Sequence, residues 1–221
     1  MKGKSKIKKI EILEEFFMKI LLVNGSPHRE GCTYTALSEV GRALTECGVE
    51  WEIHHIGTEP VRGCVGCGAC AKVGGVCVFH DENYMSLREK MVAADGIVIG
   101  SPVYYAGPNG VLTSLLDRVF YCSGKYFRGK PAAAVVSCRR GGASAAFDRL
   151  NKYFSINEMP IITSQYWNSV HGNTPEEVLQ DEEGLQTMRT LGRNMAWAVR
   201  ALSAVQMPER ESKRSRTNFI R

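Results

Sequence analysis

The segment from residue 19 to residue 35 constrains the fold of this chain more than any other. It starts with the apolar run Ile20–Val23, breaks at the turn residues Asn24–Pro27 and resumes at Thr33 with apolar residues at helical spacing. A short apolar run bounded by turn residues is typical of a buried strand, and the later spacing is typical of an amphipathic helix. We therefore expect a strand, a tight polar loop and the start of a helix.

This loop has the composition of an anion-binding site. The first turn of a helix carries unpaired N–H groups and the positive end of the helix dipole, and both favour a phosphate. Gly25 and Gly31 would let the backbone approach a ligand closely. The candidate donors and cations are Ser26, His28, Arg29, Thr33 and Thr35. The alternative is an ordinary strand-to-helix turn capped by a hydroxyl group.

Strands and helices are expected to alternate along the rest of the chain. The expected strands are 49–56, 97–100, 132–136 and 160–163, and the expected helices are 33–47, 84–94, 111–121, 144–155 and 185–205. Such alternation is typical of a parallel sheet with helices on both faces. Ligands bind these sheets beyond the carboxyl ends of the strands, where the strand order reverses.

Three loops are expected to meet at that edge of the sheet. They are the loop just described, Ser101–Pro108 after the third expected strand and Ser137–Gly142 after the fourth. Their convergence favours the anion site over the plain turn. The first loop has neither the Gly-Lys-Ser/Thr of a Walker loop nor the G-x-G-x-x-G of a dinucleotide-binding turn.

The first two loops resemble those of the flavodoxin-like NAD(P)H-dependent FMN reductases. Residues 25–33, reading GSPHREGCT, are similar to the Gly-Ser-Pro-Arg and Gly/Ser-Asn-Thr steps of that family's phosphate loop, with His28 and Cys32 where Arg and Asn are usual. Residues 101–105, reading SPVYY, match its Ser-Pro-x-Tyr motif. The resemblance covers about residues 18–205. It implies a flavodoxin-like three-layer α/β sandwich, with a five-stranded parallel sheet in the order 2-1-3-4-5.

The resemblance also implies FMN as the cofactor. The phosphate would lie against Ser26, Pro27, His28, Arg29, Cys32, Thr33, Tyr34 and Thr35. The flavin ring would lie against Pro102, Val103, Tyr104, Tyr105, Ala106 and Gly107, with Ser137, Arg139, Gly141 and Gly142 completing the site. Both tyrosines offer flat apolar surface for stacking, although core or dimer packing would use them equally well. No side chain is expected to act as a catalytic acid or base, because the flavin carries the chemistry.

A second match to the family lies in the helix that follows the ring loop. Residues 116–118, reading LDR, fit the family pattern. We interpret this tripeptide as helix packing together with a surface ion pair.

Four of the eight cysteines form a compact motif, Cys64-x2-Cys67-x2-Cys70-x6-Cys77. Thiolates this close in sequence can together hold a soft metal or an iron–sulfur cluster. The spacing resembles that of the iron–sulfur flavoproteins, which place a [4Fe-4S] cluster beside FMN on the same fold. A zinc site, a disulfide and a plain thiol loop are the alternatives. The other cysteines, Cys32, Cys47, Cys122 and Cys138, are expected to be mostly ordinary buried thiols.

The net charge of +5 gives little support to a nucleic-acid partner. Residues 1–17 contribute +2 and residues 208–221 contribute +3, which leaves the body of the chain neutral. No apolar run reaches the roughly 18 residues that a membrane span needs, and the start does not read as a secretory signal. We expect a cytoplasmic protein with an N-terminal extension (1–17), one domain (18–205, with a Cys-rich insertion at 63–80) and a basic disordered tail (206–221).

These observations lead to one principal hypothesis and two alternatives. We expect an FMN-dependent oxidoreductase that takes hydride from NAD(P)H as co-substrate and passes electrons to a small-molecule acceptor: free flavin, a quinone, a nitroaromatic compound or an iron centre. The first alternative is an iron–sulfur flavoprotein that carries electrons without its own NAD(P)H turnover. The second is a thiol or metal sensor that uses Cys64–Cys77. The resemblance also implies a homodimer or a higher homo-oligomer.

Overall fold

The computed structural model describes residues 18–212, 215 and 217. The extension expected at 1–17 lies outside these residues, and so do residues 213–214, 216 and 218–221 of the expected tail. The strands are β1 (Lys19–Asn24), β2 (Glu50–His55), β3 (Gly96–Tyr104), β4 (Gly107–Pro108), β5 (Ala132–Cys138) and β6 (Ser169–His171). The α-helices are α1 (Cys32–Glu46), α2 (Glu82–Ala93), α3 (Gly110–Ser123), α4 (Ala143–Ile156), α5 (Pro175–Val178) and α6 (Glu182–Ser203), and the short 3₁₀ helices are η1 (Ala69–Lys72) and η2 (Gly124–Tyr126).

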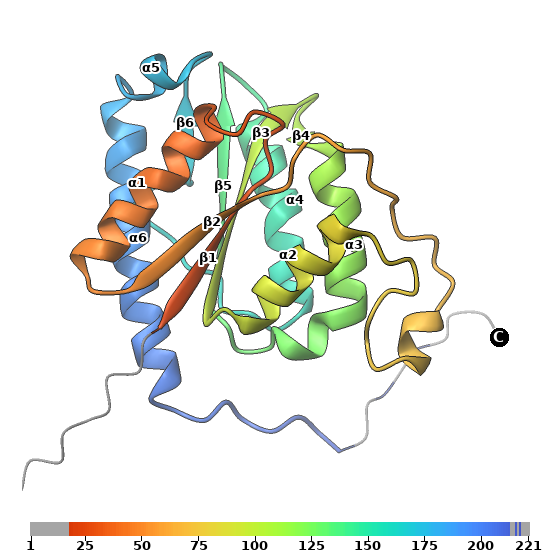
Figure 1. The fold of residues 1–221 in the computed structure, drawn as a ribbon. Helices are drawn as coiled ribbons and strands as arrows, with labels where there is room; N and C mark the ends of the chain where they lie inside the picture. The colour runs from red at the N-terminus through yellow and green to blue at the C-terminus, as the bar shows by residue number, and fades with distance from the viewer. Residues whose placement is uncertain (1–17, 213–214, 216, 218–221) are drawn as a thin grey trace, which may run out of the picture.

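The sheet has the strand order β2-β1-β3-β5-β6, and all of these strands are parallel. β4 is a two-residue strand that pairs antiparallel with the end of β3. The parallel strands alone therefore follow the order 2-1-3-4-5, and the expected flavodoxin-like fold class is confirmed. In Figure 1 their carboxyl ends lie at the upper edge of the sheet, where α1 begins and the β3–β4 hairpin turns.

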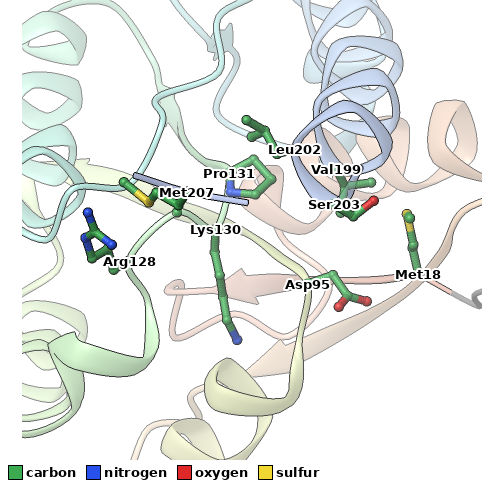
Figure 2. Close-up of a pocket in the computed structure, with 10 residues that line it drawn as sticks. Met18, Asp95, Arg128, Lys130, Pro131, Val199, Leu202, Ser203 and Met207 are labelled. Carbon is green, nitrogen blue, oxygen red and sulfur yellow. The ribbon is translucent and has the colours of Figure 1, made fainter. Parts of the chain in front are cut away.

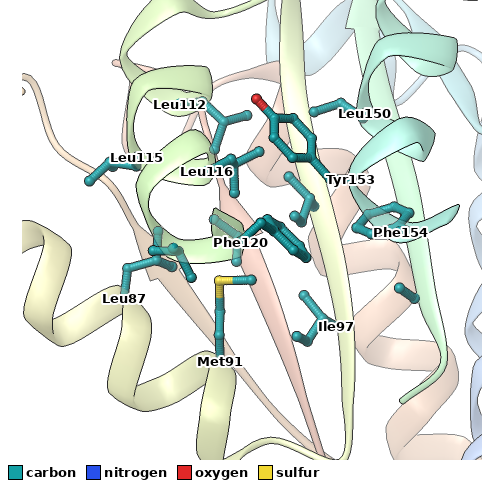
Figure 3. Close-up of a cluster of buried hydrophobic side chains, with 14 of the residues drawn as sticks. Leu87, Met91, Ile97, Leu112, Leu115, Leu116, Phe120, Leu150, Tyr153 and Phe154 are labelled. Carbon is teal, nitrogen blue, oxygen red and sulfur yellow. The ribbon is translucent and has the colours of Figure 1, made fainter. Parts of the chain in front are cut away.

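Successive residues of the central strands face opposite layers of helices. Leu21 and Val23 of β1 belong to the core beneath α2, α3 and α4, whereas Ile20 and Leu22 belong to the core beneath α1 and α6. Figure 1 shows the two helical layers, and Figure 3 shows the first core, in which Phe120 of α3 is central. Both faces of the strands are apolar because helices cover both faces. Among the described residues, no helix combines the length and the apolar character needed to cross a bilayer.

The predicted fifth strand, residues 160–163, was wrong in its bounds. Only an isolated bridge between Ile161 and Ala132 forms there, and the regular strand at this edge is β6. The chain leaves the sheet after Ile162 and returns at Asn168, whose side-chain Nδ2 donates to the carbonyl of Ala134 at 3.0 Å. A side-chain amide thus takes the place of a ladder hydrogen bond, and apolar patterning gives no sign of that exchange.

Candidate functional site

The loop between β1 and α1 is held in shape by its own polar side chains. Asn24 Oδ1 accepts from the Ser26 N–H at 3.1 Å, and Ser26 Oγ accepts from the His28 N–H at 3.1 Å. Asn24 Nδ2 donates to the Arg29 carbonyl at 3.0 Å, and a ring nitrogen of His55 lies 2.9 Å from the Ser26 carbonyl. The side chains of His28 and Arg29 are exposed. Hydrogen bonds to its own side chains and to His55 therefore fix the conformation of the loop. The two candidate cations, His28 and Arg29, are exposed on its surface.

The N-terminus of α1 has no side-chain cap among the described residues. Its N-cap is Gly31, and no side-chain hydrogen bond satisfies the first N–H groups. Thr35 uses its hydroxyl on the Gly31 carbonyl at 3.3 Å, so that group faces the helix. Uncapped N–H groups at a helix start suit an anion.

Two residues expected to contact the cofactor also contact each other. The hydroxyl oxygens of Thr33 and Ser137 lie 2.8 Å apart, and both side chains are buried. The Cys32 thiol points to the carbonyl of Gly172 at 3.7 Å, and burial raises its pKa. Tyr34 is half-buried on the first turn of α1. Thr33, Ser137 and Cys32 are thus engaged inside the protein, whereas the backbone of the loop and its exposed cations are open.

The loop after β3 is a tight hairpin with an unusual backbone. Tyr105 and Ala106 form its two-residue turn with φ angles of 49° and 59°, in the left-handed region that such turns require. Residues other than glycine, asparagine and aspartate adopt this region at a cost. Tyr104 is 45% exposed and Tyr105 is fully exposed. These two rings are therefore not packed in the core of a single chain, and both side chains are accessible to a ligand or a partner.

The loop after β5 lies directly against that hairpin. Gly142 has a φ of 86°, and a Cβ atom there would lie 2.9 Å from Ala106 Cα and 3.0 Å from Val103 Cγ1. Arg139 and Gly141 in the same loop are exposed. Glycine at 142 thus allows the second and third loops to touch, as the expected site requires.

Asn109 joins the first two loops, and the sequence interpretation did not include it. Its Nδ2 donates to the Gly25 carbonyl at 2.9 Å, and its N–H donates to Ser101 Oγ at 2.9 Å. Its Oδ1 accepts from the Val111 N–H at 2.8 Å, which makes Asn109 the N-cap of α3. An asparagine directly before an apolar helical pattern is an N-cap signal, so the cap could have been predicted, but its bond to Gly25 could not.

The cysteine loop, residues 62–81, runs along the outside of α2 and α3 (Figure 1). Cys64, Cys67, Cys70 and Cys77 line one small recess against α3, which we call the cysteine recess. Arg118, Tyr121 and Cys122 of α3 complete its wall. Cys70 and Cys77 are buried, Cys64 and Cys67 are exposed, and none of them is in a disulfide in the described part of the chain. The recess thus gathers the whole predicted motif at one place.

The donor set of this recess is four cysteine thiols, which suit an iron–sulfur cluster and also a zinc ion. In the described part of the protein, no group of three or more Cys, His, Asp or Glu residues is arranged to hold a metal ion. Cys122 is a fifth thiol at the recess, and burial beside Cys70 raises its pKa to about 12. Sequence spacing gave no reason to include Cys122.

The expected surface ion pair of residues 116–118 forms through Asp117 and does not involve Arg118. The surface pair in this region joins Asp117 to Arg149 at 3.4 Å, whereas Arg118 is only 1% exposed and pairs with Asp81 at 2.5 Å. The guanidinium lies 4.3 Å from the centre of the Tyr84 ring. Arg118 is therefore an internal part of the cysteine recess.

Two cavities lie beside the sheet, and neither lies at the point where the three loops meet. A cavity of about 490 Å³ lies at the opposite edge of the sheet, between Met18, Asp95, Lys130 and Met207 (Figure 2). There Lys130 Nζ donates to the carbonyls of Val92 and Ala94 at 2.5 and 2.6 Å. Another cavity, of about 370 Å³, borders the exposed side of the first loop, between Arg29 and the His54-His55 pair of β2.

The residues at the loop edge fit FMN. The uncapped start of α1 and the exposed Arg29 suit a phosphate, and the exposed rings of Tyr104 and Tyr105 suit a flat aromatic group. Close contact between Gly142 and Ala106 brings the second and third loops to one place. The geometry thus gathers the three expected loops at one edge of the sheet.

Comparisons with known proteins point in the same direction. The profile of a family described as NADPH-dependent FMN reductase matches residues 18–174. An iron–sulfur flavoprotein of Methanocaldococcus jannaschii is 32% identical over 193 residues, which cover 84% of this chain and 99% of the relative. An iron–sulfur flavoprotein of Archaeoglobus fulgidus is 35% identical over 184 residues, covering 78% and 86%. A flavodoxin structure from the domain Archaea has a similar fold, with a TM-score of 0.57 at 15% identity over 83% of this chain and 99% of that one.

Proposed function

Because the chain belongs to the NADPH-dependent FMN reductase family, we propose that it is an oxidoreductase that takes hydride from NADH or NADPH and passes electrons to a small-molecule acceptor. The observation that carries this proposal is the meeting of three loops at the carboxyl edge of the sheet. Each of three loops contributes one feature. The first leads into the uncapped start of α1, the second carries the two exposed tyrosines, and the third carries Gly142, which contacts Ala106 of the second. Together they supply the surfaces that a phosphate and a flat ring need.

The protein's own contribution is binding and orientation. FMN, when bound, supplies hydride and electron transfer. The backbone N–H groups at the start of α1 would hold its phosphate, with Arg29 as the neighbouring cation. Tyr104 and Tyr105 would fix the plane of the ring. Asn109 would keep the phosphate loop and the ring loop in register through its hydrogen bonds to Gly25 and Ser101.

We further propose that the cysteine recess holds a [4Fe-4S] cluster through Cys64, Cys67, Cys70 and Cys77. The four thiols share one recess, and two relatives are named as iron–sulfur flavoproteins. Helix α3 links the two sites, because it begins at the ring loop and carries Arg118 roughly 12 Å further along its axis. The cluster would take electrons singly and pass them on towards the exposed Cys64 and Cys67.

The exposure of these two cysteines also favours a second candidate function. An electron carrier needs a redox group near its surface but no nicotinamide site. A protein of this kind would accept and donate electrons with partner proteins and would not turn over NAD(P)H.

We also propose a homodimer in the cytoplasm. The fully exposed Tyr105 and the half-exposed Tyr104 offer apolar surface to a second copy beside the ring. A subunit interface there would exclude water from the flavin.

Steady-state oxidation of NADH and NADPH tests the reductase proposal. The FMN-loaded protein, purified without oxygen, would be assayed with a flavin, a quinone, a nitroaromatic compound and a ferric chelate in turn. We expect turnover with at least one acceptor, and the same rate for Arg193→Lys, which alters an exposed ion pair with Glu46. Absence of turnover with every acceptor, in protein that retains FMN, would overturn the reductase proposal in favour of the carrier.

A further inference from the structure

Arg118 is buried in the cysteine recess with one of its donors unused. Its side chain is 1% exposed, and its Nε has no hydrogen-bond partner among the described residues. A buried donor without an acceptor destabilises the folded state, and a charged donor does so more strongly. Such an unsatisfied charge inside a protein calls for an explanation.

The other nitrogens of Arg118 hold the two ends of the cysteine loop. Nη1 donates to the Arg62 carbonyl at 3.3 Å and to Asp81 Oδ2 at 2.5 Å, and Nη2 donates to the Phe79 carbonyl. Arg62 lies two residues before Cys64, and Phe79 lies two residues after Cys77. One guanidinium thus joins the entry and the exit of the four-cysteine segment.

The same side chain lines the recess that contains Cys77. Arg118 and the four cysteines surround one small space, and the guanidinium lies within electrostatic range of the Cys77 side chain. Tyr84, which stacks under the guanidinium, accepts the Cys77 N–H at 2.9 Å through its hydroxyl. A neutral thiol is a weak acceptor, whereas a thiolate bound to iron carries negative charge and accepts strongly.

We propose that Arg118 is a positioning residue for the iron–sulfur site. Its Nη groups fix both ends of the cysteine loop, and its unpaired Nε–H donates to the sulfur of Cys77 once that sulfur is bound to iron. A donor at a ligand sulfur stabilises added negative charge, so Arg118 raises the reduction potential of the site. This inference rests on the cluster proposed above and goes beyond it, because it assigns a role to a residue outside the four ligands.

A purely structural role for Arg118 makes a different prediction. A clamp that only holds the loop would affect how firmly iron is retained and leave the potential unchanged. Donation to sulfur moves the potential as well. The potential of the cluster therefore separates the two roles.

Arg118→Lys provides the test, because lysine keeps the positive charge and lacks the Nε–H. The matched control is Arg193→Lys on α6, where the arginine is exposed. The readouts on anaerobically purified protein are FMN content, iron and acid-labile sulfide, the midpoint potential of the cluster and the rate of iron loss to a chelator. We expect unchanged FMN, a lower midpoint potential and iron loss about 10–100-fold faster in Arg118→Lys, with none of these changes in the control.

The outcomes distinguish this inference from the cluster proposal on which it rests. Wild-type protein that contains FMN and no iron overturns both. Wild-type protein with a cluster, and Arg118→Lys with the same midpoint potential, overturns the role of Arg118 alone. If Arg118→Lys does not fold, pulsed electron paramagnetic resonance of the reduced wild-type cluster, with ¹⁵N-labelled arginine, gives the answer. A ¹⁵N coupling supports donation by Arg118, and its absence overturns it.

Discussion

The hydroxyl oxygens of Thr33 and Ser137 lie 2.8 Å apart across the end of the intervening strand β3. Thr33 belongs to the first turn of α1, and Ser137 lies near the end of β5. Gly100 of β3 gives them room, because a Cβ atom there would lie 2.9 Å from Thr33 Cγ2. This bond joins the first and third loops of the proposed flavin site beneath its surface.

Thr33 and Ser137 are expected to contribute to stability as a coupled pair. Ser137→Ala leaves the buried Thr33 hydroxyl without its partner and should lower the free energy of unfolding by about 1–3 kcal/mol. The double variant Thr33→Val/Ser137→Ala should cost less than the sum of the two single changes. Urea denaturation of the four proteins measures the coupling. Strictly additive effects would contradict a direct bond.

Gly142→Ala is expected to separate the second and third loops. The new methyl group would meet Ala106 Cα at 2.9 Å, and the residue would have to keep a φ of 86°. We expect FMN affinity to fall about tenfold, which corresponds to about 1.4 kcal/mol. Gly66→Ala in the cysteine loop is the matched control, because its φ of 65° imposes the same kind of strain and nothing lies within 4 Å of its Cβ position. Fluorescence titration with FMN measures both, and equal affinities would count against the loop contact.

Tyr105→Asn is expected to stabilise the folded protein and to weaken FMN binding. Asparagine tolerates the left-handed turn position better than tyrosine does, so the free energy of unfolding should rise. Loss of the exposed ring should weaken FMN binding by about 1 kcal/mol. Ala106→Gly is the control, because it relieves the same kind of strain at a φ of 59° and keeps the tyrosine. Weakened FMN binding in the control but not in Tyr105→Asn would contradict the stacking role.

Local sequence patterns predicted the helices and strands of this fold, but they did not predict contacts between residues far apart in the chain. The strand, loop and helix around Ser26 could be predicted because an apolar run, turn residues and helical spacing are all local signals. The compact cysteine motif could be found for the same reason. The burial of Arg118 could not, because it depends on Asp81 and on two carbonyls far along the chain.

Contacts between residues far apart in the chain explain the other differences from the sequence-based predictions. Asn168 completes the edge of the sheet with its amide, so the predicted fifth strand had the wrong bounds. Asn109 joins two loops 84 residues apart through Gly25. Cys122 reaches the recess only because α3 packs against the cysteine loop. Each of these is a property of the folded contacts, and none has a pattern in the neighbouring sequence.

Acid is expected to destabilise the protein partly through His54. Burial, and next the nearby Lys90, lower the pKa of His54 from 6.5 to about 4, while Glu52 acts in the opposite direction. The unfolded chain therefore binds this proton more readily, and the stability contributed by neutral His54 is lost as the pH falls from 6.5 towards 4. His54→Asn should flatten this part of the curve of unfolding free energy against pH, whereas His80→Asn, at an exposed position, should not. An unchanged curve in His54→Asn would rule out this contribution.

Replacing one recess cysteine is expected to remove the metal and spare the flavin. Cys77→Ser should lose iron and acid-labile sulfide and keep its FMN, because the two sites use different loops. Cys47→Ser, at the C-terminal end of α1, is the control and should keep both. A Cys77→Ser protein that retains all its iron would exclude this residue as a ligand.

A chain that binds FMN at the loop edge and a cluster in the cysteine recess should contain both groups after one purification. The decisive experiment is an absorption spectrum of protein purified without oxygen, with FMN, iron and sulfide assayed on the same sample. We expect flavin bands on a broad iron–sulfur shoulder, with one FMN and about four irons and four sulfides per chain. Flavin without iron would contradict the cluster, and failure to bind FMN even when it is added would contradict the site at the loop edge.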